Sequence, residues 1–141
     1  VCLEYDMIKR DPISHKVCKI EQDMIYAGGV GIYEGNAYIN CQGSIIDLQQ
    51  GNGLWVYSDV QYPSSLDIEY CTITNGIYYG ISYGGDAIGN VNNCNLINTN
   101  FGLKLFDYTN VFVTNSIFAS NETYTSTLFN TIKYKRIFVR P

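Results

Sequence analysis

The sequence predicts an all-β fold, a single-stranded right-handed parallel β-helix of about four to five rungs. Three observations lead to this prediction. Similar residues recur about every 22 residues, apolar and polar residues alternate with a period of two between them, and Asn or Gly stands where strands should end. A single rung of this kind cannot bury its apolar side, so successive rungs must stack and share one core.

Two sets of residues define the repeat. The first is a Gly followed by an aliphatic residue, at steps of 22, 27 and 22 residues. Its members are Gly31-Ile32, Gly53-Leu54, Gly80-Ile81 and Gly102-Leu103. The second is a ladder of small residues in short apolar strands, made up of Cys18, Cys41, Cys71, Cys94 and Asn115. We expect each set to return to one wall of the coil, with the ladder inside the core.

Strand and corner residues can be assigned within each repeat. Leu66 and Ile68 alternate with Asp67 and Glu69, which is the period of a strand with one buried side. After the Cys-centred strands come Asn residues, which tolerate the left-handed backbone of a tight corner. These corner residues are Asn75, Asn98 and Asn121.

The repeat divides the chain into three segments. Residues 1–30 are expected to form an N-terminal cap with a partial rung, residues 31–121 the body, and residues 122–141 a C-terminal strand that serves as a cap or an assembly tail. The tail is basic, while an open β-helix exposes unpaired backbone at its end. We expect it to close its own end; the alternative is docking onto a second copy, which gives a homo-oligomer or a filament.

Charge and composition exclude two classes of partner. The net charge is −4, and no Lys or Arg occurs between Ile20 and Leu103. A protein that binds nucleic acid needs a basic surface, so this class is not expected. The longest uncharged run, Ala87 to Leu103, contains six Asn, which excludes it as a membrane span.

Three segments carry a resemblance to a known family. They begin Cys41-Gln-Gly-Ser-Ile-Ile-Asp-Leu, Leu66-Asp-Ile-Glu-Tyr-Cys-Thr-Ile and Asn93-Cys-Asn-Leu-Ile-Asn-Thr-Asn. Residues 28–121 resemble the pectate-lyase-like right-handed parallel β-helix superfamily, in the form shared by carbohydrate-binding and sugar-hydrolase domains of surface and periplasmic proteins. The resemblance implies the coil fold and a secreted or cell-surface location. It implies no single chemistry, because this scaffold carries lyases, hydrolases, phage tailspikes and adhesins.

The cysteine ladder has three interpretations. Free Cys is among the most buried residue types, so a column of packed core thiols is expected first. A disulfide between adjacent rungs is the second, since the rung spacing lies within the Cα separation that a disulfide needs. A metal column is the third. Cys2 stands outside the ladder and could pair elsewhere.

The carboxylates Asp67 and Glu69 form the candidate metal site. They lie two residues apart on an outward strand face, and the next rung adds Asn90 and Asn92. Carboxylate and amide oxygens suit calcium, the one cofactor that the sequence suggests. The separation also approaches that of an inverting glycosidase pair. A solvated strand face without any cofactor is the first expectation.

Asp86 and Lys104 are the candidate catalytic residues. Tyr83-Gly-Gly-Asp-Ala-Ile-Gly and Asn98-Thr-Asn-Phe-Gly-Leu-Lys-Leu resemble elements of the polygalacturonase branch. That branch has a second acid, a Gly-His-Gly element and an Arg where Leu103 stands, and the sole histidine, His15, lies far upstream. Hydrolysis needs an acid and a base carboxylate together, so we expect no enzyme activity by this route.

Aromatic residues give the candidate carbohydrate site. Tyr33, Trp55, Tyr57 and Phe106 fall at outward positions of the Gly-led strands, where exposed rings could stack on sugars. The alternative is that a loop or another subunit covers these rings.

Together these patterns favour a non-catalytic extracellular β-helix module. It would be structural or self-assembling, as in a surface layer, sheath or fibre, or it would contact glycans. The alternative is a fragment or divergent member of a polysaccharide-degrading enzyme or phage tailspike.

Overall fold

The computed structural model describes residues 22–119, 121, 123–126, 131–135 and 138–140, with side chains described at 22–119 and 121. Its strands form three parallel sheets. Sheet I contains β2 (Gly31–Tyr33), β5 (Leu54–Ser58), β8 (Tyr79–Gly85), β11 (Phe101–Leu105) and β14 (Thr123–Ser126). Sheet II contains β3 (Gly35–Asn40), β6 (Ser64–Glu69), β9 (Ile88–Asn92), β12 (Asn110–Thr114) and β15 (Thr131–Lys135). Sheet III contains β1 (Ile25–Ala27), β4 (Ile45–Asp47), β7 (Thr72–Thr74), β10 (Asn95–Ile97), β13 (Ile117–Ala119) and β16 (Phe138–Arg140).

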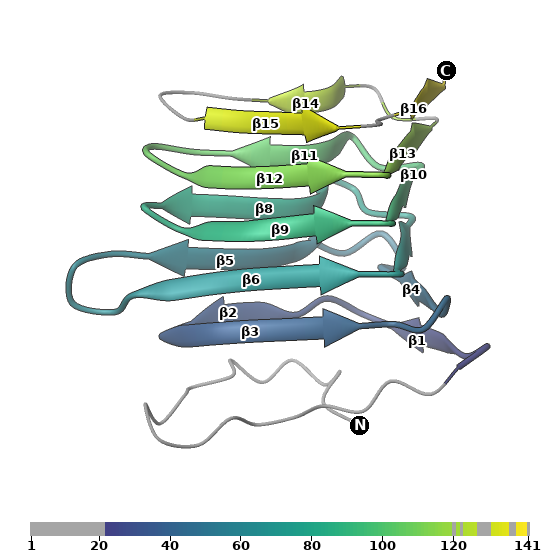
Figure 1. Cartoon of the computed structure of the whole chain (residues 1–141). Helices are drawn as coiled ribbons and strands as arrows, with labels where there is room; N and C mark the ends of the chain where they lie inside the picture. Colours follow the sequence, from purple (N-terminus) through teal and green to yellow (C-terminus); the bar gives the residue numbers. More distant parts are fainter. Residues whose placement is uncertain (1–21, 120, 122, 127–130, 136–137, 141) are drawn as a thin grey trace.

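The chain visits the three sheets in turn and climbs one rung per circuit, which makes a right-handed coil (Figure 1). Each strand pairs in parallel with the strand three places later, as in β6 with β9 and β9 with β12. The predicted fold class, an all-β parallel solenoid of about four to five rungs, is confirmed. Cys2, His15 and Cys18 lie outside the described residues, as does most of the predicted N-terminal cap.

The core consists of columns of inward side chains, one from each rung. In sheet I the two columns are Val30, Leu54, Ile81, Leu103 and then Ile32, Val56, Tyr83, Leu105. Sheet III contributes Tyr26, Ile46, Ile73, Leu96 and Phe118, and all of these side chains are buried. This arrangement is the shared interior that the period predicted, because no rung could bury these residues by itself.

The register of the first rung differs from the prediction. Gly31 pairs with Trp55, so the residue level with Gly53 is Gly29 rather than Gly31. The corner between β3 and β4 has four residues, Cys41 to Ser44, where the later corners between sheets II and III have two. The two additional residues lengthen this circuit, and the 22-residue step from Gly31 to Gly53 matched the period by coincidence.

The small-residue ladder is corrected at two members, Cys41 and Asn115. Cys41 is buried as predicted, but it is not level with Cys71. Ser44, Cys71, Cys94 and Ser116 form the buried column, as the pairing of β4, β7, β10 and β13 shows. Asn115 is exposed and lies one residue before it. Asn115 instead occupies the corner with φ of 48°, level with Asn93 at 50° and Tyr70 at 53°. A single left-handed residue makes this corner in three rungs, and the short polar side chain of Asn tolerates that conformation.

The predicted corner residues Asn75 and Asn98 are confirmed between sheets III and I. Both have left-handed backbone, with φ of 60° and 54°. The Asn98 amide donates to Asn75 Oδ1 at 2.7 Å, and the Asn75 amide donates to Asp47 Oδ1 at 3.1 Å. This corner is therefore joined from rung to rung by side chains as well as by backbone. In the following rung, Asn121 Oδ1 accepts a hydrogen bond from the Thr99 backbone N–H at 3.0 Å.

The coil extends at both ends beyond the predicted body of residues 31–121. β1 begins at Ile25 and pairs with β4, so the first described circuit starts before residue 31. β14, β15 and β16 pair with β11, β12 and β13, and thereby continue all three sheets past residue 121.

Candidate functional site

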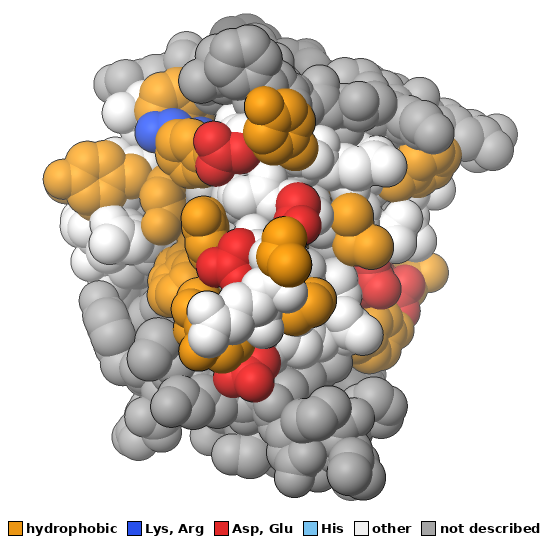
Figure 2. Space-filling view, turned by 90° about the vertical axis from the view of Figure 1, so that its left-hand side faces the viewer, with side chains coloured by type: hydrophobic (Ala, Val, Ile, Leu, Met, Phe, Trp, Pro, Cys, Tyr) orange, Lys and Arg blue, Asp and Glu red, His pale blue; other side chains and the backbone are white. Residues whose placement is uncertain are grey.

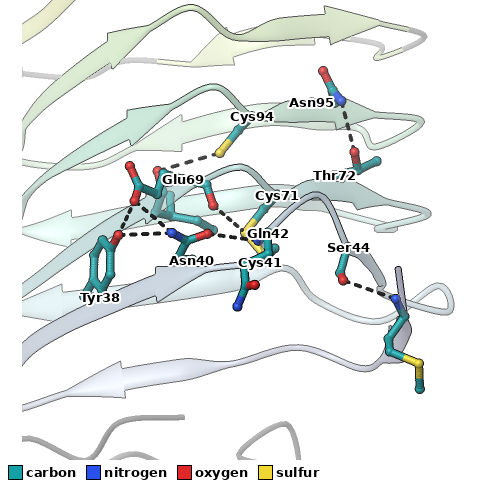
Figure 3. Close-up of a disulfide and its surroundings, with 12 residues drawn as sticks. Tyr38, Asn40, Cys41, Gln42, Ser44, Glu69, Cys71, Thr72, Cys94 and Asn95 are labelled. Carbon is teal, nitrogen blue, oxygen red and sulfur yellow. Dashed lines mark hydrogen bonds between the residues drawn. A yellow bond between two sulfur atoms is a disulfide. The ribbon is translucent and has the colours of Figure 1, made fainter. Parts of the chain in front are cut away.

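The three described cysteines, Cys41, Cys71 and Cys94, lie where sheet II turns into sheet III (Figure 3). Cys41 and Cys71 form a disulfide that joins neighbouring rungs with a Cα separation of 4.8 Å. Cys94 is a buried free thiol one rung further on, and its Sγ lies 3.3 Å from the Asn92 carbonyl. The column therefore combines two of the three interpretations, packing and a disulfide. Among the residues that the structure describes, no group of three or more His, Cys, Asp or Glu could hold a metal ion.

Two buried groups make the native state sensitive to alkaline pH. Burial raises the pKa of the Cys94 thiol from its ordinary value of 9.0 to about 11. Burial also raises the pKa of Tyr83 well above its ordinary value, and its hydroxyl donates to the Leu66 carbonyl at 2.8 Å. The unfolded chain loses these protons at lower pH than the native one, so the stabilisation is complete below the unfolded pKa and is lost as pH rises toward the folded pKa.

We therefore expect the free energy of unfolding to fall between about pH 9 and pH 11, with Cys94 contributing about 2 to 3 kcal/mol of the loss. Urea titrations at a series of pH values measure this profile. The Cys94→Ala variant should show a shallower decline, with the contribution of Tyr83 remaining. A profile that is flat over this interval, or identical in the variant, would contradict the assignment.

Asp67 and Glu69 are held by different partners. Asp67 Oδ1 accepts the Asn90 backbone N–H at 2.9 Å and the Asn90 side-chain amide at 2.8 Å. Glu69 Oε1 accepts from the Tyr38 hydroxyl and from the Asn40 amide at 3.0 Å (Figure 3). Each carboxylate is thus bound into its own cross-rung network on the outward face of sheet II. Calcium binding by Asp67 and Glu69 stays a prediction.

Asp86 and Lys104 belong to different regions of the coil. Asp86 is exposed in the turn from β8 to β9, where its backbone N–H donates to the Ser58 carbonyl at 3.0 Å. Lys104 projects from β11, with its Nζ 4.6 Å from the centre of the Phe101 ring and 4.9 Å from that of Phe106. Lys104 therefore belongs to an aromatic cluster, because its ammonium group is attracted to the two rings by cation–π interaction.

The four predicted aromatic residues share the outward face of sheet I. Tyr33 is level with Tyr57, and Phe106 follows two rungs later in the same column, with Gly84 between. Trp55 stands in the neighbouring column, level with Gly31 rather than with Tyr33. Together with Phe101 and Lys104, these four side chains define a surface that we call the aromatic face.

Glycines let the rings of the aromatic face lie close to the sheet. A Cβ added to Gly31 would fall 2.4 Å from the Trp55 ring, so the indole covers this glycine. A Cβ on Gly84 would meet the Tyr57 ring at 3.0 Å and the Phe106 ring at 3.9 Å. Tyr57 and Phe106 remain 42% and 38% exposed. Tyr33 is supported from the β5–β6 loop by Tyr62, at 5.0 Å between ring centres.

The described surface is acidic beside this face. Residues 22–119 contain eight carboxylates and one basic residue, Lys104. Each of the four turns from sheet I to sheet II within residues 22–119 carries one acid; these are Glu34, Asp59, Asp86 and Asp107. Figure 2 looks onto this edge and shows red carboxylates spread along it, with blue confined to one side. An anionic ligand would meet repulsion here, whereas a neutral one would not.

A further hollow on sheet II was not predicted. It is lined by Ser65, Asp67, Ile88, Gly89, Asn90, Asn110 and Phe112 and measures about 320 Å³. A ladder in which Asn115 is equivalent to Cys94 predicts that Phe112 is level with the buried Val91, but Phe112 is level with Asn90 and 41% exposed. The alternating pattern of Val111 and Val113, both buried, is the sequence signal that could have placed Phe112 outside.

Comparisons with protein-family models, with curated proteins and with solved structures found no significant match. The described residues contain no helix long and apolar enough to cross a membrane.

Proposed function

We propose that the chain is a non-catalytic, secreted or cell-surface β-helix module that binds a neutral glycan along the aromatic face. In this proposal it is a divergent relative of the pectate-lyase-like β-helix proteins that keeps their scaffold and lacks the catalytic set. The supporting observation is that Tyr33, Trp55, Tyr57 and Phe106 lie on the outward side of one sheet, in the rungs of β2, β5 and β11. The rings of Trp55, Tyr57 and Phe106 lie against glycine.

The geometry suits an extended sugar chain lying along the axis of the coil. Rungs are about 4.8 Å apart, so Tyr57 and Phe106 are separated by roughly 10 Å, with Gly84 at the level between them. Aromatic faces attract the C–H faces of pyranose rings, while the Tyr hydroxyls and Lys104 supply polar contacts. Because the surrounding charge is negative, neutral polysaccharides are favoured over uronates.

The alternative is an active polysaccharide-degrading enzyme, for which Asp86 is the candidate acid. It is exposed, and no shared partner joins it to Lys104 in the contacts described above. Self-assembly through the C-terminal segment is compatible with the module proposed here. Its basic residues Lys133, Lys135 and Arg140 lie in β15 of sheet II and β16 of sheet III, whereas the aromatic face lies on sheet I.

We expect Trp55→Ala to weaken binding to a neutral polysaccharide by about 10- to 30-fold, since a central aromatic side chain contributes on the order of 1.5 to 2 kcal/mol. Affinity electrophoresis against plant and bacterial polysaccharides identifies the ligand and measures the loss. Tyr38→Ala is the control, because Tyr38 is 59% exposed and lies in β3 of sheet II, whereas the aromatic face lies on sheet I.

Three results would contradict the proposal. They are no binding to any neutral polysaccharide, unchanged binding by the Trp55→Ala variant, and turnover of a polysaccharide that Asp86→Asn abolishes.

A further inference from the structure

We infer that the hollow on sheet II is a second binding site, separate from the aromatic face, which takes a single neutral hexopyranose unit. We call it the β9 groove and define it by its lining residues, Ser65, Asp67, Ile88, Gly89, Asn90, Asn110 and Phe112. These come from β6, β9 and β12, three consecutive rungs of one sheet. At about 320 Å³ the groove lies at the small end of the range for small-molecule sites. This size favours one sugar ring over a chain.

The polar side of the groove is arranged before a ligand arrives. Asp67 Oδ1 receives both hydrogen bonds from Asn90, which fixes the carboxylate and leaves Oδ2 to accept from a ligand hydroxyl. The Ser65 hydroxyl donates to Asn36 Oδ1 at 2.7 Å, so its oxygen faces a ligand as an acceptor. The Asn110 amide makes no hydrogen bond to a side chain that the structure describes, and it can both donate and accept.

The apolar side of the groove supplies a surface for the C–H face of a sugar. Phe112 and Ile88 are 41% and 55% exposed, and both project from the outward side of strands whose other side faces the core. Asp67, Asn90 and Phe112 occupy one outward column, so the carboxylate and the ring lie about two rungs, or roughly 10 Å, apart. A pyranose ring placed over Asn90 would reach the carboxylate at one end and the phenyl ring at the other.

The side chains favour a neutral polyol over a charged ligand. The acidic surroundings disfavour an anion. A quaternary ammonium could be attracted by Asp67 and by the Phe112 ring, but it offers no acceptor for the amide donors of Asn90 and Asn110. A sugar with neighbouring hydroxyls uses the carboxylate, both amides and the ring together. The groove shares no residue with the aromatic face, so this inference does not rest on the proposed function.

Saturation-transfer NMR with methyl glycosides of glucose, galactose, mannose and N-acetylglucosamine tests the site. We expect at least one glycoside to bind with a Kd on the order of 1 mM. Phe112→Ala should weaken this binding at least about tenfold, and Asp67→Asn by about five- to tenfold. Circular dichroism and thermal melting establish that both variants remain folded.

The matched control is Phe106→Ala, which removes a phenyl ring of similar exposure, 38% against 41%, from the aromatic face. It should leave glycoside binding intact and weaken polysaccharide binding, whereas Phe112→Ala should do the reverse. Failure of either site is thus distinguishable from failure of the other. Three results would overturn the inference. The first is that no glycoside binds at concentrations well above the expected Kd, and the second is that Phe112→Ala and Phe106→Ala lose glycoside binding equally. The third is selective binding of tetramethylammonium that Asp67→Asn abolishes.

Discussion

Replacing Gly89 with alanine is expected to lower the free energy of unfolding by at least about 3 kcal/mol, a large fraction of the stability of a domain of this size. Gly89 lies in β9 opposite Leu66. A Cβ at this position would fall 1.9 Å from the Leu66 carbonyl oxygen and 2.8 Å from Cε1 of Tyr83. The first clash is with backbone, so only a shift of one strand against its neighbour could relieve it.

The same substitution also disturbs Tyr83, the largest fully buried side chain among the described residues, whose hydroxyl donates to the same Leu66 carbonyl. Urea denaturation followed by circular dichroism measures the loss. Gly43→Ala is the matched control, because a Cβ there would meet nothing within 4 Å. Its φ of 87° makes a loss of about 1 kcal/mol expected from backbone strain alone. Equal losses of unfolding free energy in the two variants would contradict the packing described around Gly89.

Removal of the disulfide is expected to cost about 3 to 4 kcal/mol. Cys41 and Cys71 are 30 residues apart, and the segment between them contains β4, β5 and β6. The bond therefore closes one complete circuit of the coil and restricts that circuit in the unfolded chain. The double variant Cys41→Ala with Cys71→Ala should show the loss in urea, and a reductant should bring the native protein to a similar midpoint.

Cys94→Ala is the control for this second prediction, since it removes a buried sulfur from the same column without opening a bond. It should cost only about 1 kcal/mol at neutral pH. Peptide mapping of the oxidised protein should find Cys41 linked to Cys71. A Cys71–Cys94 link, or a double variant no less stable than Cys94→Ala, would contradict the assignment.

The sequence alone predicts the coil because side-chain burial repeats with the backbone. Inward residues such as Ile68 and Val91 recur in register, and the corners at Asn75 and Asn98 have the backbone that their residue type favours. Register within a rung is harder to predict, since it depends on how many residues each corner contains. Because the Cys41–Ser44 corner has two additional residues, the observed partner of Gly53 is Gly29, whereas the period predicted Gly31.

The candidate sites follow the same division. The aromatic face could be predicted because an error of two residues keeps a side chain on the same side of a strand, so Tyr33 stayed outward. The β9 groove could not be predicted, because a register error of one residue at Asn115 assigns Phe112 to the buried side of its strand. The disulfide remained one of several alternatives because Cys41 begins a four-residue corner, so that Ser44 rather than Cys41 is level with Cys71.

The register of stacked rungs is the central claim, and paired-cysteine cross-linking tests it most directly. Ser82 in β8 and Lys104 in β11 are level with each other on the outward face of sheet I. With Cys2, Cys18 and Cys94 changed to alanine, the pair Ser82→Cys and Lys104→Cys should form a disulfide readily under mild oxidation. The pair Ser82→Cys and Phe106→Cys, two residues out of register and roughly 8 Å apart at Cα, should not. Equal cross-linking of the two pairs, or linkage of only the second, would contradict the coil described here.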